Sequence, residues 1–381
     1  MENQEQAVID FSYELYKESV EPLIRYKGLR NLHLIIGHSP FIRDSKGDFM
    51  PLMLEMEDDA GHTHNVHFNP ITGRWLHDFM NLMFMEYFGM SPEESEEAIK
   101  MYMSGERTQQ IFQLESGTLI YLRMDASFSG SGMVLTAVPR YEAKYALPSQ
   151  ILSIKEQLPG LVLFTGSYGS NRAYTMYTLL LNFIQNLPRK ISFVEQVPRY
   201  NLDFIKESLV MRRIAFDPQT TYYTELIRAL TTDVDIICLD DISEPKAFDT
   251  ALRACAAGKT VFAQLGASSI PEALDAILLR YEPKKREMIR YQLSIALRAV
   301  VFQQKLPTAE GIDFPNIPAY ELIAGHPLSH FIGTYKPGES SVNEFIAQNP
   351  KDCIAMQQSL EQLRASGTID ERTFSLFSTK E

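Results

Sequence analysis

Cysteine is scarce in this sequence. The three cysteines among 381 residues, Cys238, Cys255 and Cys353, lie far apart and show no C-x-x-C spacing. Cys238 and Cys255 also fall in apolar segments. This pattern favours buried, reduced thiols in a cytosolic protein.

Long apolar runs are also missing. No run approaches the ~20 residues that a helix needs to span a bilayer, and the first six residues are polar and acidic, unlike a signal peptide. We therefore expect a cytoplasmic protein without a membrane span. Any peripheral association of the protein with an inner membrane would then depend on partner proteins.

Positive charge is in deficit. The 36 Lys and Arg residues face 48 Asp and Glu residues, which gives a net charge of -12. Direct binding of nucleic acid through its phosphates is therefore not expected, although a local basic patch is not excluded. A hydrophobic content of 45% and a charged content of 22% are typical of a globular protein, and the length suffices for two domains.

A short apolar run, a glycine loop and a long apolar-rich segment follow one another at residues 160–185. The run Leu161–Phe164 is typical of a buried parallel strand, and the loop contains Gly166 and Gly169. The segment after the loop suits a buried helix. Strand, glycine loop and helix form the layout of a phosphate-binding P-loop, with an ordinary βα turn as the alternative.

The P-loop motif G-x-x-x-x-G-K-[ST] is incomplete here. Gly166 fits its first position, whereas Asn171, Arg172 and Ala173 replace the second glycine, the lysine and the Ser/Thr. Asparagine tolerates a left-handed backbone, so Asn171 can keep the shape of the loop. Arg172 keeps the charge in a larger, planar group, and Ala173 has no hydroxyl for Mg²⁺. The candidate nucleotide-binding residues are Gly166, Ser167, Tyr168, Gly169, Ser170, Asn171, Arg172 and Ala173.

The first 140 residues mix helices with strands. We expect a helix over 7–28, helices over 72–88 and 91–103 that start at Thr72 and Ser91, and a hairpin of 109–114 with 118–124. Further expected strands are 32–36, 41–43, 49–54 and 134–138, with turns at 44–48 and 127–132. These elements predict a mixed α/β domain, followed by a linker at 141–150.

From Leu161 onward, strands alternate with helices, which predicts a mainly parallel sheet. The expected strands are 161–164, 191–195, 236–239 and 260–264, and the expected helices are 173–185, 222–231, 246–257, 271–280 and 287–304. A stretch rich in Pro and Gly follows Pro307, before helices near 341–347 and 351–365.

Three histidines, His62, His64 and His67, stand close together. Imidazole suits Zn²⁺ or Ni²⁺, but no cysteine is near and the segment is typical of an exposed hairpin. We therefore expect no metal site there.

The glycine loop and several other segments resemble the PilT-type ATPases of type IV pilus retraction, within the wider secretion and conjugation traffic ATPases. Residues 160–173, G-L-V-L-F-T-G-S-Y-G-S-N-R-A, are similar to the family's G-L-V-L-V-T-G-P-T-G-S-G-K-S. Residues 31–43, 251–262, 269–275 and 292–300 are similar to further family motifs in the same order. Tyr168, where the family has Thr, would either stack on another group or fill an empty phosphate pocket.

The resemblance implies an α/β protein with a PAS-like α+β domain over 1–140, a linker over 141–150 and a RecA-like P-loop domain with C-terminal helices over 151–381. It also implies a cytosolic ring, usually a hexamer, that holds ATP and Mg²⁺ between the two domains. The expected partners are further copies of the chain or a paralogous ATPase in a mixed ring, and the inner-membrane platform protein of a pilus or secretion machine.

The resemblance also shows where catalytic groups should be. Asp241 falls at the position of the family's catalytic Glu, and its side chain is one methylene shorter. The preceding residue, Asp240, replaces a Gly of the family, and Ser243 replaces an Arg. Glu195 survives from the acidic box, whereas Gly266 stands at the position of the family's His. In the first domain, Thr136 replaces an arginine that the family lends to a neighbour's nucleotide.

The apolar segments around each of these altered motifs are kept, whereas charged residues of the family motifs have been replaced. The hypothesis that this favours is a degenerate paralogue with lost or weak ATP hydrolysis, acting in the assembly or regulation of a pilus, secretion or conjugation machine. The alternative is an active, divergent hexameric motor that uses Arg172, Asp241 and Glu195 to drive retraction or secretion.

Overall fold

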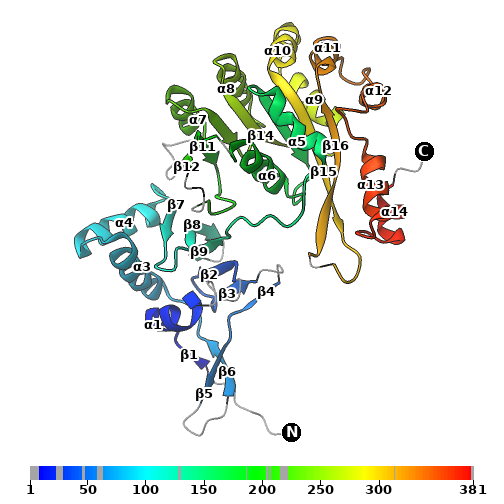
Figure 1. The fold of residues 1–381 in the computed structure, drawn as a ribbon. Helices are drawn as coiled ribbons and strands as arrows, with labels where there is room; N and C mark the ends of the chain where they lie inside the picture. Colours follow the sequence, from blue (N-terminus) through cyan, green and yellow to red (C-terminus); the bar gives the residue numbers. More distant parts are fainter. Residues whose placement is uncertain are drawn as a thin grey trace. The chain divides into compact units, whose positions relative to one another are not determined.

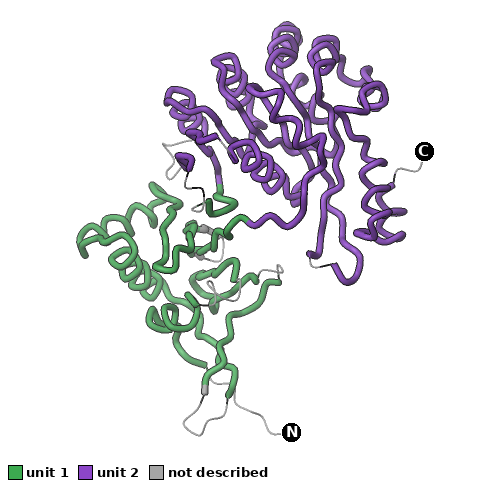
Figure 2. The backbone as a smooth tube through the Cα atoms, in the orientation of Figure 1, with its two compact units in different colours: residues 1–141, 197–202, 215–221 green, residues 142–196, 203–214, 222–381 purple. Residues whose placement is uncertain are grey.

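The computed structural model describes residues 8–22, 29–44, 48–57, 63–127, 130–185, 187–202, 205, 207–214, 222–312 and 314–378 (Figure 1). The chain divides into two compact units (Figure 2). Unit 1 comprises residues 1–141, 197–202 and 215–221, and unit 2 comprises residues 142–196, 203–214 and 222–381.

Unit 1 is built on a six-stranded antiparallel sheet in the order β4-β3-β2-β9-β8-β7, beside a three-stranded sheet in the order β1-β6-β5. The strands are β1 (Val8–Ile9), β2 (Asn31–Ile35), β3 (Phe41–Arg43), β4 (Phe49–Pro51), β5 (Leu54–Glu57), β6 (Thr63–Phe68), β7 (Gln109–Gln113), β8 (Leu119–Ser127) and β9 (Gly130–Val138). The helical segments are α1 (Tyr13–Leu15), the π-helical η1 (Tyr16–Val20), α3 (Gly73–Phe88) and α4 (Pro92–Ser104).

The two long helices of unit 1 begin where their capping residues predict. The Thr72 hydroxyl accepts a hydrogen bond from the Trp75 amide at the start of α3. Ser91 and Glu94 form a reciprocal capping box at the start of α4. Both helices end at a glycine with a left-handed backbone. The predicted helices over 72–88 and 91–103 are therefore confirmed.

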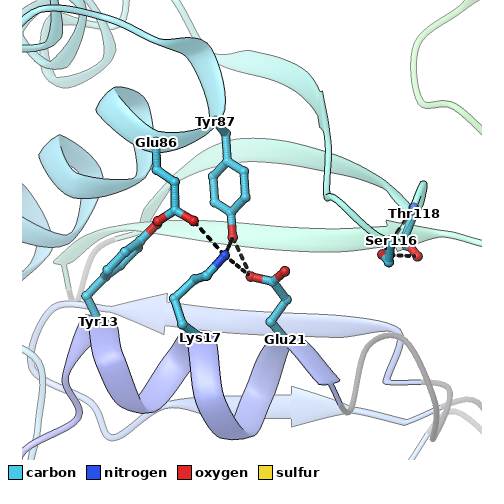
Figure 3. A network of polar contacts seen from close by, with 7 residues as sticks. All are labelled: Tyr13, Lys17, Glu21, Glu86, Tyr87, Ser116 and Thr118. Atoms are coloured by element: carbon cyan, nitrogen blue, oxygen red, sulfur yellow. Dashed lines mark hydrogen bonds and ion pairs between the residues drawn. The ribbon is translucent and has the colours of Figure 1, made fainter.

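A polar network joins the first helical segment to α3 (Figure 3). The Lys17 ammonium lies 2.8 Å from the Glu21 carboxylate and 2.6 Å from that of Glu86. Lys17 also donates to the Tyr87 hydroxyl at 3.1 Å, and the Tyr13 hydroxyl donates to Glu86 at 2.5 Å. Burial lowers the pKa of Lys17, but the two carboxylates outweigh it, so that the pKa is raised on balance. The cation is thus held by groups from both segments.

Several expectations for unit 1 need correction. The helix predicted over 7–28 is wrong at its start, because residues 8–9 form β1 and the Ser12 hydroxyl caps a helix that begins at Tyr13. The strand predicted over 49–54 divides into β4 and β5. The turn predicted over 127–132 is shorter, because β9 already begins at Gly130. Residues 23–28, 45–47, 128–129 and His62, on which parts of these predictions fall, lie outside the described residues.

Unit 2 is built on a seven-stranded sheet in the order β12-β11-β13-β14-β10-β15-β16. All neighbouring strands pair in parallel except β16, which runs antiparallel to β15. The strands are β10 (Leu161–Gly166), β11 (Lys190–Glu195), β12 (Leu209–Ile214), β13 (Ile236–Leu239), β14 (Thr260–Gly266), β15 (Leu297–Pro307) and β16 (Asn316–Ala324). The prediction of a mainly parallel sheet is confirmed, including all four predicted strands.

Helices cover both faces of this sheet. The side chains of α6 pack on Phe193 and Gln264, whereas α7 to α12 contribute to a core with Leu161, Val194 and Ile237. The helices are α5 (Ser149–Ser153), a 3-10 turn η2 (Ile154–Gln157), α6 (Arg172–Ile184), α7 (Tyr222–Thr231), α8 (Pro245–Ala256), α9 (Ile270–Leu279), α10 (Pro283–Ala296), α11 (Pro327–Thr334), α12 (Val342–Gln348), α13 (Met356–Ala365) and α14 (Glu371–Phe377). Among the described helices, none has both the length and the apolar content that a bilayer crossing requires.

The helix predicted over 287–304 is wrong in its second half. Helix α10 ends at Ala296, and the chain continues directly into strand β15. A short apolar run such as 299–302 does not distinguish a helix from a buried strand, and no glycine or proline marks this boundary. The antiparallel partner β16 lies in the Pro- and Gly-rich stretch where no strand was predicted. The helix predicted over 351–365 starts only at Met356.

Candidate active site

The carboxyl ends of four parallel strands bring the candidate residues to one edge of the unit 2 sheet. Gly166 ends β10 and pairs in register with Gly266, which ends β14. Glu195 ends β11, next to β13, which leads directly into Asp240 and Asp241. This is the edge at which open α/β sheets bind their ligands. We refer to it as the carboxyl edge.

The backbone of the glycine loop follows a tight path that requires its special residues. Gly166 has a φ of 152°, and a Cβ added there would lie 2.5 Å from the Ser170 hydroxyl and 2.6 Å from the Gln303 carbonyl oxygen. Gly169 has a φ of 80°, and Asn171, directly before α6, has a φ of 69°. The expectation that Asn171 takes the left-handed conformation in place of the second glycine is therefore confirmed.

The side chains of the loop point in different directions. Tyr168 is 98% exposed, so the expectation that it fills an empty phosphate pocket is wrong. Ser167 is also exposed, whereas Ser170 is buried and its carbonyl accepts a hydrogen bond from the Gln303 side chain. The Gln303 side chain of β15 therefore fixes the backbone of the loop.

Arg172 turns back onto the end of the strand that precedes the loop. Its Nη1 donates a hydrogen bond of 2.8 Å to the Gly166 carbonyl oxygen. The same atom would lie 3.5 Å from a Cβ built on Gly266. The guanidinium thus lies against Gly266, where a histidine side chain would compete for its space. Ala173, the next residue, is buried and offers no side-chain oxygen.

Glu195 is held inside the unit by two partners that the sequence analysis missed. The Tyr177 hydroxyl donates to Glu195 Oε1 at 2.6 Å, and Arg212 Nη1 lies 3.4 Å from Glu195 Oε2. The Phe193 ring stacks on Tyr177 at 5.0 Å, with the Arg212 guanidinium 5.9 Å from its centre. Burial, and then the Glu195 charge, raise the pKa of Tyr177, so its hydroxyl stays a proton donor. Glu195 is therefore the hydrogen-bond acceptor and the negative charge of this buried network.

The two aspartates after β13 bind neighbouring backbone and side-chain groups. Asp240 Oδ2 accepts a hydrogen bond of 2.6 Å from the Gln196 amide. Asp241 accepts two from Ser243, at 3.0 Å from its amide and 2.5 Å from its hydroxyl. Ser243, which replaces the family's arginine, thus occupies both oxygens of the Asp241 carboxylate.

Thr136 lies on β9 of unit 1. Its hydroxyl accepts a hydrogen bond of 2.7 Å from the Asn31 side-chain amide of the neighbouring strand β2. The position that bears an arginine in the resembling family is here a short side chain bound within its own sheet.

The loop backbone at the carboxyl edge suits a phosphate, whereas alanine stands where a hydroxyl would bind Mg²⁺. Ala173 lacks the oxygen that would bind Mg²⁺, and the Arg172 guanidinium is bound to a carbonyl. Within the described parts of the chain, no group of three His, Cys, Asp or Glu side chains could hold a metal ion. Of the three clustered histidines, His64 is exposed and His67 half-buried on β6, and His62 is outside the described residues.

Comparison with known proteins gives a consistent result. The family model described as "Type II/IV secretion system protein" matches residues 132–311. The chain is 27% identical over 227 residues to the twitching motility protein of Neisseria gonorrhoeae, covering 58% of this chain and 59% of that protein. It is 22% identical over 235 residues to the type IV pilus ATPase PilU of Pseudomonas aeruginosa, covering 58% and 61%. The chain thus spans about three fifths of the length of these curated relatives.

The fold is similar to solved structures over the whole chain. The structure of the pilus retraction motor PilT with bound ADP covers 97% of this chain and 98% of its own, with a TM-score of 0.72 and 21% identity. The ATPase DotB of Legionella pneumophila covers 96% of both chains, with a TM-score of 0.67 and 16% identity. The matched family model, these relatives and the glycine loop at the carboxyl edge thus agree in their similarity to the PilT-type traffic ATPases of type II/IV secretion.

Proposed function

We propose that this chain is a cytoplasmic subunit of a type IV pilus, secretion or conjugation machine, with lost or weak ATP hydrolysis and a role in assembly or regulation. One observation carries the proposal. The Arg172 guanidinium, at the position of the phosphate-binding lysine, donates to the Gly166 carbonyl and lies against Gly266. A phosphate would have to draw it away from both.

The surrounding groups support the same conclusion. Phosphoryl transfer depends on positioned charges rather than on covalent chemistry by the protein. Here Glu195 is engaged by Tyr177 and Arg212, and Asp241 is engaged by Ser243. Each candidate carboxylate would have to leave its present partner before it could polarise water or bind Mg²⁺. Weak or absent binding of ATP and Mg²⁺ follows.

We further propose that the chain assembles as a homo-hexamer or in a mixed ring with a paralogous ATPase, at the inner-membrane platform protein of its machine. Rings are typical of the family. Thr136, whose hydroxyl is bound to the Asn31 side chain, offers no guanidinium to the nucleotide of a neighbouring subunit. In a mixed ring, this chain would therefore contribute structure rather than a catalytic arginine.

A divergent motor is the second candidate. The observation that favours it is that Glu195 ends β11 and Asp241 follows the neighbouring parallel strand β13, at the edge where the glycine loop lies. A motor would have to rearrange the contacts of both carboxylates during each cycle.

The test is titration calorimetry of the purified full chain with Mg²⁺-ATP, with a hydrolysis assay on the same sample. We expect no measurable binding, or weak binding without turnover. The triple variant Asn171→Gly, Arg172→Lys, Ala173→Ser should gain binding, because it restores the lysine and the hydroxyl in an intact loop. The matched control is Asn171→Gly alone, which alters only the backbone position and should gain nothing. Tight Mg²⁺-dependent binding with turnover by the wild type would refute the proposal and favour the motor.

A further inference from the structure

A cavity of about 380 Å³ lies at the opposite edge of the unit 2 sheet, where the parallel strands begin. Gly160 and Arg298, which line it, stand at the starts of β10 and β15. Its walls are the last turns of α8 and the second half of α10, two helices in mutual contact (Figure 1). The lining is mainly apolar and includes Leu252, Cys255, Met288 and Ile295. It also includes the Asp249 carboxylate, which accepts a hydrogen bond of 2.6 Å from the Tyr281 hydroxyl. We refer to this region as the amino edge.

Helix α10 carries apolar side chains on a face that the unit does not cover. Met288, Tyr291 and Ile295 are 53%, 66% and 54% exposed, and their spacing places them along one side of the helix. The opposite side of α10 packs Ile289 and Leu293 into the core. Met288 and Ile295 also line the cavity, so the exposed stripe leads into it. A stripe of this spacing beside an apolar groove is typical of a peptide-docking surface.

The charge around this stripe is positive, in contrast to the net charge of -12 of the chain. Arg286 and Arg298 donate to backbone carbonyl oxygens, such as those of Tyr281 and Pro159, both at 2.9 Å. Neutral carbonyls leave the charge of a guanidinium uncompensated. Among the described residues, the only carboxylate within 4.0 Å of a cation on α10 is Glu287, which pairs with Arg290. The cationic residues of this region are Arg253, Lys284, Lys285, Arg286, Arg290 and Arg298, and they outnumber its carboxylates, which are Asp249, Glu282 and Glu287.

We propose that the cavity and the exposed stripe of α10 dock an acidic segment of a partner protein, with a leucine or phenylalanine of that segment inserted in the cavity. The apolar lining selects the anchor, and the uncompensated cations select the acidic flanks. A partly open cavity of this size fits a side chain, whereas the flat surface of a bilayer has no group to place inside it. The docking surface lies at the other edge of the sheet from the glycine loop, so the inference does not depend on the proposed loss of ATP hydrolysis.

The experiment selects from a displayed library of random peptides of about twelve residues on the full chain, and then titrates synthetic peptides by fluorescence anisotropy. We expect enrichment of Asp- and Glu-rich sequences that contain one Leu or Phe. Met288→Glu and Ile295→Glu should each weaken their binding by roughly tenfold or more, because each places an unpaired carboxylate against the anchor. Arg253→Glu should weaken acidic peptides more than neutral analogues with the same anchor.

The matched control is Leu376→Glu, which adds the same charge at a 74% exposed apolar residue on α14 and should leave the affinity unchanged. Enriched peptides that are basic, or that bind Ile295→Glu as well as the wild type, would overturn the proposal. It would also be overturned by sedimentation of the wild type as an assembly that Ile295→Glu dissociates, which would make a second copy the occupant. Binding to phosphatidylglycerol vesicles without any peptide binding would indicate a membrane surface instead.

Discussion

The two edges of the unit 2 sheet differ in how far their side chains are already engaged. At the carboxyl edge, the carboxylates of Glu195, Asp240 and Asp241 all bind groups of the same unit. At the amino edge, the side chains of Met288, Tyr291 and Ile295 stay exposed and have no hydrogen bond to another described residue that must break before they meet a partner. A group that is to meet a ligand must be available at a low free-energy cost, because every internal bond has to be broken first. By this criterion, the amino edge is the better prepared for binding.

The largest expected effect tests whether Glu195 is structural. Glu195→Ala would leave the Arg212 charge and the Tyr177 hydroxyl without their buried partner. We expect a loss of about 3–5 kcal/mol in the free energy of unfolding, measured by urea unfolding followed by circular dichroism. Asp241→Ala is the control, with an expected loss of about 0.5–1.5 kcal/mol because its partner Ser243 is local and partly solvated. An unchanged unfolding midpoint for Glu195→Ala would break the contrast between the edges.

The next effect concerns pH. Glu321 on β16 is half-buried, and this partial burial raises the pKa of its carboxyl to about 7. Because a raised carboxyl pKa means that the folded state holds the proton more tightly, stability falls as pH rises from the unfolded value towards 7 and stays low above it. Glu321→Gln should remove this loss, which we expect to be about 2–4 kcal/mol. The difference between variant and wild type in urea unfolding should thus be larger at pH 8 than at pH 5. Equal differences at both values would contradict the assignment.

A smaller effect is expected in the glycine loop. Gly166→Ala places a methyl group against the Ser170 hydroxyl and the Gln303 carbonyl, in addition to the cost of its positive φ. We expect a loss of about 1–3 kcal/mol, determined by thermal and urea unfolding. Gly169→Ala, with nothing within 4 Å of its added methyl group, should lose less and serves as the control. If both variants lose the same free energy of unfolding, the close contact at Gly166 does not contribute to stability.

The smallest effect is expected at the amino edge. Ile295→Glu should change the free energy of unfolding by less than about 0.5 kcal/mol, because an exposed side chain loses little on replacement. Urea unfolding of this variant therefore also serves as the folding control for the docking experiment. A loss comparable to that of Glu195→Ala would mean that the stripe belongs to the core.

The sequence allowed much of unit 2 to be predicted, because its strands are short apolar runs and its helices have clear starts. The run 161–164 and the left-handed Asn171 are examples. The strand β15 was missed because no breaker separates it from α10 and its apolar run carries no period.

The partners of the candidate site could not be predicted. Tyr177 and Arg212 reach Glu195 from α6 and β12, a contact across the fold that no local pattern encodes. Similarly, the sequence showed that Arg172 keeps a positive charge, but not that this charge is bound to the Gly166 carbonyl. Residue types at family positions therefore indicated a candidate site, whereas the contacts of its side chains depend on long-range neighbours.

Arg212 and Arg213 have a further consequence, because β12 is the edge strand of the seven-stranded sheet. Cations on an edge strand discourage strand pairing between molecules, which is a route to aggregation. Arg212 reaches Glu195 and Arg213 lies 3.8 Å from Glu225, so both arginines also neutralise carboxylates of their own unit. A mutation that released Glu195 by removing Arg212 would also remove a charge that protects this edge. Selection for solubility would thus oppose the release of Glu195 from its buried network.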